Sequence, residues 1–239
     1  MNAGMVGQHS CPLRDSTRKN VAPRPPTPPP LIVNEARNCQ SYFDLLSRSI
    51  RNLPFEQVDN ISEIMFQAYQ KQHTVFVFGN GGSAALASHL ACDLGKGTVN
   101  CSPKRFKVMA LTDNVALMTA WANDSHYENI FSEQLANFAR PEDVAFAISA
   151  SGNSANVLKA LNAARQAGLV TAGLTGFRGG RMLALCDACV VVPSDNMQII
   201  EDLHLSIAHA LFTCIRDRIM YPSSDSRVGP RLLGRVAGE

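Results

Sequence analysis

The sequence predicts an α/β protein built on a parallel sheet with helices on both faces. Five short apolar segments of strand length alternate with segments whose apolar residues recur at helical spacing. Strands that are separated by helical crossovers form parallel sheets covered on both sides. Two of the apolar segments end in loops rich in Gly, Asn and Ser, at the sheet edge where open α/β folds bind ligands.

The chain has 239 residues, and its two ends differ in composition from the middle. Residues 1–34 contain the run Pro-Arg-Pro-Pro-Thr-Pro-Pro-Pro, which lacks backbone donors and favours an extended path, so we expect a disordered arm. Turn formers and scattered arginines predict a flexible tail at 221–239. The remaining stretch, 35–220, suits one hydrophobic core and is expected to be a single domain.

The predicted elements follow in order from these patterns. Apolar residues at helical spacing predict two helices ahead of the sheet, at 36–53 and 55–72. Runs rich in Val, Phe, Ile and Ala predict the strands 74–78, 106–111, 144–148, 171–174 and 188–192. Helices are expected to start at residue 83 and to cover 114–122, 128–138, 154–167, 181–185 and 197–220.

Composition and charge exclude several classes of function. A net charge of +2, with basic residues scattered along the chain, gives no support for nucleic-acid binding. No apolar run is long enough to cross a bilayer, and the N-terminus does not read as a secretion signal, so we expect a cytoplasmic protein without a membrane partner. Seven irregularly spaced cysteines do not predict a disulfide framework.

The two polar loops predict a phosphate site. Gly-Asn-Gly-Gly-Ser at 79–83 and Ser-Ala-Ser-Gly-Asn-Ser at 149–154 each lie between a predicted strand and a predicted helix. The first N–H groups of a helix are unpaired and carry partial positive charge, and serine hydroxyls add donors for phosphoryl oxygens. Ordinary helix capping explains one such loop, whereas two at one sheet edge favour a sugar-phosphate ligand.

A second group of residues consists of histidines and carboxylates on two predicted helices. His89 and Asp93 are four apart on a predicted helix and therefore share one face. The final helix supplies Glu201, His204 and His209. Imidazoles and carboxylates suit a zinc-like ion, while a plain polar interface is the alternative. His204 lies about 140° around the helix from His209, so a structural role suits it better.

Five motifs, in this order, resemble the phosphoheptose isomerases of the sugar isomerase (SIS) superfamily. They are the glycine-rich loop at 79–83, Trp-Ala-Asn-Asp at 121–124, the segment 148–157, Leu-Thr-Gly at 174–176 and Glu-Asp-Leu-His at 201–204. The resemblance covers roughly 36–220. It implies a three-layer α/β/α sandwich with a five-stranded flavodoxin-like sheet, preceded by two helices and assembled as a homotetramer with active sites at subunit boundaries.

The resemblance also implies an activity and its substrate contacts. Members of the family convert sedoheptulose 7-phosphate to D-glycero-D-manno-heptose 7-phosphate, through an enediol. The family's substrate contacts fall here on Asn80, Gly81, Gly82, Asn123, Asp124, Ser149, Ala150, Ser151, Ser154 and Glu201, with Ser83 as an additional donor. Ala150 stands where the family has Thr, so one hydroxyl is missing.

The family's metal ligands match His89, Asp93, Glu201 and His209, which implies zinc or another divalent ion. The family has Glu at the position of Asp93 and Gln at that of Glu201. The resemblance implies that Asp93 is the base and His209 the acid, although Glu201 could serve as base. Along one helix, Glu201 and His209 are about 12 Å apart, so the site is irregular or shared between subunits.

Two other functions remain open from the sequence. A non-catalytic relative that binds a replication initiator, or senses a phosphosugar, has a similar glycine-rich opening. An isomerase of another phosphosugar would use the same loops, because they recognise phosphate and hydroxyls. His89, Asp93 and His209 together favour an enzyme, because a protein-binding relative has no need of them.

Overall fold

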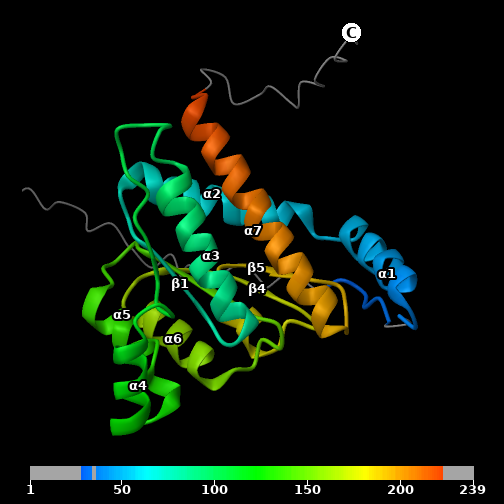
Figure 1. Cartoon of the computed structure of the whole chain (residues 1–239). Coiled ribbons are helices and arrows are strands. Elements are labelled where there is room, and N and C mark those ends of the chain that lie inside the picture. The colour runs from blue at the N-terminus through cyan, green and yellow to red at the C-terminus, as the bar shows by residue number, and fades with distance from the viewer. Residues whose placement is uncertain (1–27, 34–35, 223–239) are drawn as a thin grey trace, which may run out of the picture.

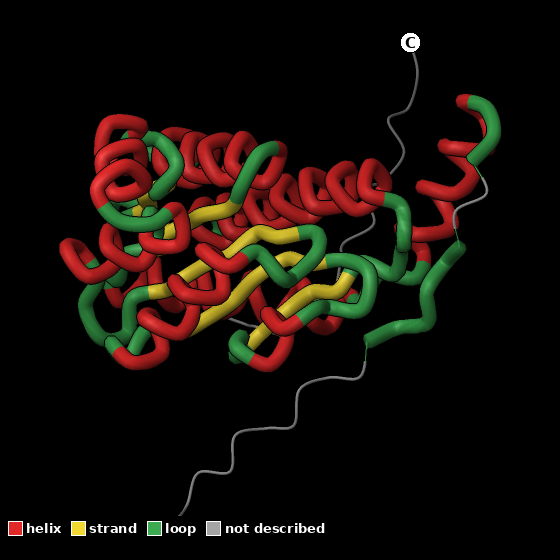
Figure 2. Tube along the Cα trace, turned by 90° about the horizontal axis from the view of Figure 1, so that it is seen from below, coloured by secondary structure: helices red, strands yellow, loops and turns green. Residues whose placement is uncertain are grey.

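The computed structural model describes residues 28–33 and 36–222 and contains the predicted parallel sheet (Figures 1 and 2). The strands lie in the order β2-β1-β3-β4-β5, and every neighbouring pair is parallel. Their bounds are β1 (Val75–Gly79), β2 (Val108–Ala110), β3 (Val144–Ser149), β4 (Val170–Thr175) and β5 (Ala188–Val191). The predicted fold class, with two helices ahead of a five-stranded sheet, is confirmed.

Helices cover both faces of this sheet (Figure 1). One layer contains α2 (Phe55–Lys71), α3 (Gly82–Gly97) and α7 (Met197–Met220), and the other contains α4 (Val115–Asp124), α5 (Ser132–Phe138) and α6 (Ala155–Gln166). The short 3-10 helices η1 (Tyr127–Asn129) and η2 (Arg181–Ala184) complete the order of elements, and α1 (Cys39–Arg51) precedes them all.

Alternation along the strands divides the apolar residues between two cores. In β1, Val75 and Val77 point into the core between the sheet and the layer of α2, α3 and α7. Phe76 and Phe78 point into the core on the opposite face, with Phe131. Successive strand side chains point to opposite faces, and a sheet buried on both faces needs apolar residues at every position. This explains why the strands read as continuous apolar runs.

Two predicted elements are shorter in the structure. The strand predicted at 106–111 is limited to β2 at the sheet edge, where Met109 is 40% exposed. The helix predicted at 128–138 is divided into η1 and α5, joined by the buried Ile130 and Phe131. Both segments lie at the periphery, where packing rather than periodicity determines the bounds.

The first helix stands apart from the main body of the domain in both views (Figures 1 and 2). It begins after Asn38, whose side chain accepts a hydrogen bond from the backbone N–H of Ser41 in a capping box, which places the start later than predicted. Tyr42 donates a hydrogen bond to Asp202 on α7. Phe43 is 62% exposed, so this apolar side chain has little cover among the described residues.

The arm predicted at 1–34 touches the domain at its end. Ile32 forms a parallel bridge with Ser194, and its N–H donates to the carbonyl of Pro193 at 3.1 Å. The contact holds the described residues 28–33 beside the end of β5. Residues 1–27 and 223–239 lie outside the described residues, so the predicted disorder of the arm and flexibility of the tail stay predictions. No helix within the described ranges is long and apolar enough to cross a membrane.

Two glycine substitutions test the tightness of the sheet. A Cβ at Gly173 in β4 would lie 2.5 Å from the carbonyl oxygen of Ala147 and would clash with Met182. We expect Gly173→Ala to lower the free energy of unfolding by about 1–3 kcal/mol, the usual cost of overpacking. Urea denaturation measures this change.

The matched control is Gly95→Ala, in the last turn of α3. Its nearest neighbour would be Val108 Cγ1 at 3.4 Å, an ordinary contact. This substitution should raise the free energy of unfolding by about 0.5–1 kcal/mol, because alanine favours the helix. Equal effects of the two substitutions would contradict the packing described here.

Candidate active site

The two glycine- and serine-containing loops meet at one edge of the sheet. Since β1 and β3 pair directly, their ends bring 79–83 and 149–154 side by side at the starts of α3 and α6. A cavity of about 160 Å³ lies between them. It is lined by Asn80, Ser83, Ile148, Ser149, Ala150, Ser151, Ser154, Met197 and Glu201, and we call it the anion pocket.

Close backbone approach shapes this pocket. A Cβ at Gly79 would lie 2.5 Å from the carbonyl oxygen of Ile148, so glycine lets β1 and the first loop approach β3. Gly81 has φ +57° at the N-cap of α3, and Gly152 has φ +64° in the second loop, both in the left-handed region. Gly81 and Gly82 do not line the anion pocket, but Gly82 borders the next cavity along α3.

Asn80 is held by two residues that the sequence did not single out. Its side-chain amide exchanges two hydrogen bonds with the buried amide of Asn156, at 2.9 and 2.8 Å. Tyr127 also donates to the Asn80 Oδ1 atom, at 3.1 Å. An asparagine in the first turn of a helix is an ordinary residue, so only the paired amides in the fold reveal a role in orienting Asn80.

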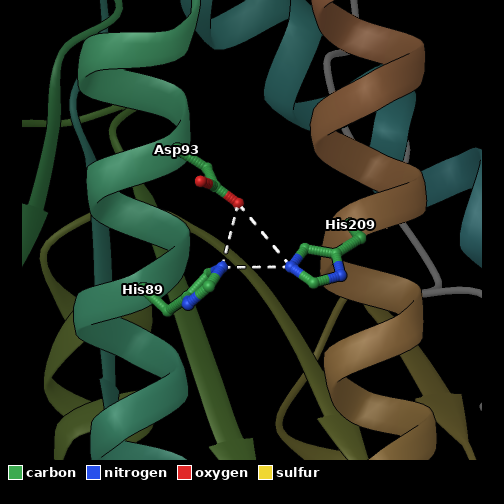
Figure 3. Close-up of side chains that lie close together, drawn as sticks. All are labelled: His89, Asp93 and His209. Carbon is green, nitrogen blue, oxygen red and sulfur yellow. Dashed lines mark hydrogen bonds and ion pairs between the residues drawn. The ribbon is translucent and has the colours of Figure 1, made fainter.

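His89, Asp93 and His209 converge between α3 and α7, as Figure 3 shows. The two histidine Nε2 atoms are 3.0 Å apart, and Asp93 Oδ2 lies 3.3 Å from His89 Nε2 and 4.0 Å from His209 Nε2. Both imidazoles are about half exposed, at 48% and 50% of the side chain, so a ligand from solvent can reach them. We call these three side chains the α3–α7 triad.

The triad fits a zinc-type ion. Ligands at ~2.0–2.1 Å around a tetrahedral zinc lie about 3.3 Å from one another. The separations of His89 from His209 and from Asp93, 3.0 and 3.3 Å, are close to this value, and that of His209 from Asp93, 4.0 Å, is longer. Two imidazole nitrogens and one carboxylate oxygen are also the donors that zinc prefers. Cys92, a possible ligand by its place three residues after His89, is exposed and is not part of this group.

Glu201, the fourth predicted ligand, is not a member of the group formed by the described residues. The helix α7 is continuous from Met197 to Met220, so Glu201 and His209 stay about 12 Å apart along its axis. Instead, Glu201 lies against the start of α3: a Cβ at Gly82 would be 3.0 Å from Glu201 Oε1. Its carboxylate therefore borders the anion pocket.

A second cavity connects the two groups. It has a volume of about 310 Å³ and lies between α3 and α7. Its lining consists of Gly82, Ser83, Ala85, Leu86, His89, Glu201, Asp202, His204 and Leu205. Because Ser83 and Glu201 line both cavities and His89 lines this one, polar side chains border the space from the anion pocket to His89 of the triad.

Asn123 and Asp124 do not reach either cavity. They are exposed at the C-terminal end of α4, where the Asn123 amide donates to Asp124 Oδ1 at 2.8 Å. Neither the anion pocket nor the cavity between α3 and α7 includes them among its lining residues. If they contact substrate, the contact requires movement or a second subunit.

His204 is fully buried in the wall of the cavity between α3 and α7. Its Nε2 atom lies 3.2 Å from the carbonyl oxygen of Thr175, and its Nδ1 atom has no hydrogen-bond partner among the described residues. Burial lowers the pKa of His204 to about 4, against a smaller opposing effect of the Thr175 carbonyl. The imidazole is therefore neutral at pH 7, with the proton on Nε2.

Comparison with known proteins identifies relatives. The sequence profile of the family described as "SIS domain" matches residues 40–176. A phosphoheptose isomerase of Rhodospirillum rubrum is 45% identical over 146 residues, which are 61% of this chain and 77% of that protein. A phosphoheptose isomerase of Helicobacter pylori is 36% identical over 175 residues, covering 73% and 90%. The structure of phosphoheptose isomerase GmhA from Neisseria gonorrhoeae aligns with a TM-score of 0.70 at 30% identity, covering 74% of this chain and 96% of that one.

The depressed pKa of His204 predicts a pH dependence of stability. Between about pH 6.5 and about pH 4, His204 is protonated in the unfolded chain and neutral in the native protein. The free energy of unfolding therefore falls as the pH falls through this window. From pH 7 to pH 4.5 this residue should remove roughly 2 to 3 kcal/mol of unfolding free energy.

The measurement is urea denaturation of the parent and of His204→Gln at both pH values. Glutamine does not titrate, so the variant should lose less stability on acidification by that amount. Parallel losses in the two proteins would show that His204 is protonated in the native state or not buried as described.

Proposed function

Because this chain belongs to the SIS domain family, and within it to the phosphoheptose isomerases, we propose that it interconverts sedoheptulose 7-phosphate and D-glycero-D-manno-heptose 7-phosphate. One observation carries the proposal for this chain's own residues. The cavity between α3 and α7 shares Ser83 and Glu201 with the anion pocket and is lined by His89 of the triad, so one ligand can extend from the anion pocket to His89.

The anion pocket supplies the phosphate contacts. Ser151 and Ser154 offer hydroxyl donors, and the first N–H groups of α3 and α6 add partial positive charge. Ala150 removes one hydroxyl at this wall but keeps its backbone N–H. The sugar chain then extends past Ser83 and Glu201 toward His89, with its hydroxyls available to these side chains.

The chemistry is a proton transfer between neighbouring carbons. A base removes a proton from C1 of the ketose and returns it to C2, while the O1 hydroxyl loses its proton and the carbonyl oxygen O2 gains one. Asp93 is the proposed base and His209 the proposed acid, as the family resemblance implies, and both lie next to His89, which lines the cavity. His89, 3.3 Å from Asp93, orients that carboxylate.

The same three side chains would hold a divalent metal, with zinc as the first choice. Such an ion supplies charge stabilisation at the carbonyl oxygen of the substrate. Glu201 is proposed as a substrate contact, and it is the second candidate for the base because it borders both cavities. Glu201 on α7 thus borders the path of the sugar, and Asp93 on α3 lies 3.3 Å from His89 at its end.

A non-catalytic relative that only binds a partner or senses a phosphosugar is the competing function. Such a protein needs the anion pocket at most, whereas the triad adds two imidazoles and a carboxylate within 4.8 Å of one another beside it. This arrangement favours the enzyme. The cytoplasmic location expected from the sequence stays a prediction.

A homotetramer is the proposed assembly. Two features support it: apolar side chains of α1 such as Phe43 and Ile50 are exposed, and Asn123 and Asp124 line neither the anion pocket nor the cavity between α3 and α7. A neighbouring subunit would cover Phe43 and Ile50, and its active site would receive Asn123 and Asp124.

Removal of a triad side chain should abolish both metal binding and turnover. We expect about one divalent ion per chain in the purified protein, and release of that ion in His89→Ala and His209→Ala. Asp93→Asn should lower kcat by about 10²–10⁴-fold, the usual contribution of a general base, with a smaller change in KM. Metal analysis and detection of the heptose 7-phosphate product measure these effects.

Cys92→Ala is the matched control, because Cys92 is exposed on the same helix next to Asp93 and outside the triad. It should keep the ion and the rate. A parent protein without metal and without turnover would support the binding function instead. Full activity in Asp93→Asn would move the base to Glu201, which Glu201→Gln then tests.

The assembly is tested by measuring the mass of the protein under native conditions. We expect the mass of four chains for the parent and of smaller species for a Phe43→Ser/Ile50→Ser variant, because both side chains are exposed in the single chain and need no repacking there. Asp44→Ser, an exposed polar change on the same helix, should leave the mass unchanged. A monomeric parent with full activity would contradict the shared site.

A further inference from the structure

The loop 149–154, which is the second loop of the anion pocket, is hydrogen-bonded to the end of β4 and the segment that follows it. The carbonyl oxygen of Ala150 accepts hydrogen bonds from the Gly176 N–H at 2.9 Å and from the Thr175 hydroxyl at 3.4 Å. The carbonyl oxygen of Gly152 accepts from the Met182 N–H at 2.9 Å. Loop 149–154 therefore depends for its shape on where residues 175–182 lie.

Residues 175 and 176 are in turn fixed by α7. A Cβ at Gly176 would clash with Ile200, so the helix rests directly on this backbone. One turn later, the neutral imidazole of His204 donates through Nε2 to the carbonyl oxygen of Thr175 at 3.2 Å. That oxygen also accepts from the Val192 N–H at 2.8 Å, so it remains paired when the histidine is removed.

We propose that His204 is a positioning residue for phosphate binding: through Thr175 it fixes the Ala150 side of the loop and so couples α7 to the anion pocket. The inference rests on the proposed function only in that the pocket binds a phosphate group. The helix that carries Glu201 and His209 then also sets the geometry of the phosphate contacts.

The burial of His204 argues for a specific role of its N–H. His204 Nδ1 is a fully buried acceptor without a hydrogen-bond partner among the described residues, and leaving such an acceptor unpaired costs free energy. An apolar side chain at this position would avoid that cost. A histidine is accordingly disfavoured there by packing alone. The donor at Nε2 is the feature that an apolar residue cannot supply.

Two substitutions separate this donor from the rest of the ring. Glutamine places an amide N–H near the Nε2 position, whereas leucine fills similar volume without a donor. The experiment measures the affinity of the metal-loaded parent, His204→Gln and His204→Leu for inorganic phosphate by titration calorimetry, together with KM and kcat for the phosphoheptose. Thermal unfolding of each protein verifies the fold.

We expect phosphate to bind about tenfold more weakly to His204→Leu, the size of one net hydrogen bond, and within about twofold of the parent to His204→Gln. KM should follow the phosphate affinity, while kcat changes less. Should His204→Leu not fold, Thr175→Val removes the hydroxyl donor to Ala150 with little change of shape, and it should weaken phosphate binding in the same direction.

Equal phosphate affinity in the parent and a folded His204→Leu would overturn the inference. So would a glutamine variant as weak as the leucine variant, because the required feature would then be Nδ1 and not the donor. Phosphate affinities in the expected order, in a parent that does not turn over the phosphoheptose, contradict the proposed function alone. A parent that binds no phosphate contradicts both.

Discussion

The packing of α3 against α7 is the contact on which the site depends. Glycine lets the two helices approach at both ends of α3: a Cβ at Gly82 would be 3.0 Å from Glu201, and one at Gly97 would be 2.5 Å from Phe212. Between these points lie the cavity and the triad. A change in the spacing of the helices would alter the triad and the cavity together.

The sequence predicted the fold well because its signals are local. Apolar strands, helical periodicity and two loops at strand ends specify a parallel sheet whatever the details of packing. The convergence of His89 and Asp93 follows from their spacing of four on one helix. Their meeting with His209 came from the family resemblance, because it depends on how two distant helices pack.

The neighbours of Glu201 and Asn156 could not be read from the chain, although the separation of Glu201 and His209 along one helix could. Glu201 matches a family ligand position, yet the continuous helix keeps it a full 12 Å or so along the axis from His209 and against the start of α3. The role of Asn156 was missed because it consists of two hydrogen bonds between its side-chain amide and that of Asn80, which is 76 residues away. Such pairings are tertiary and leave no periodic signal.

The unbroken course of α7 limits how this part of the chain can change during evolution. One continuous helix from Met197 to Met220 carries both the residues that line the cavity and His209, which completes the triad. Inserting or deleting a single amino acid between Glu201 and His209 would rotate one relative to the other by about 100° and shift it by about 1.5 Å. Homologues that keep this chemistry are therefore expected to differ here by replacement of residues and to conserve the length of the segment.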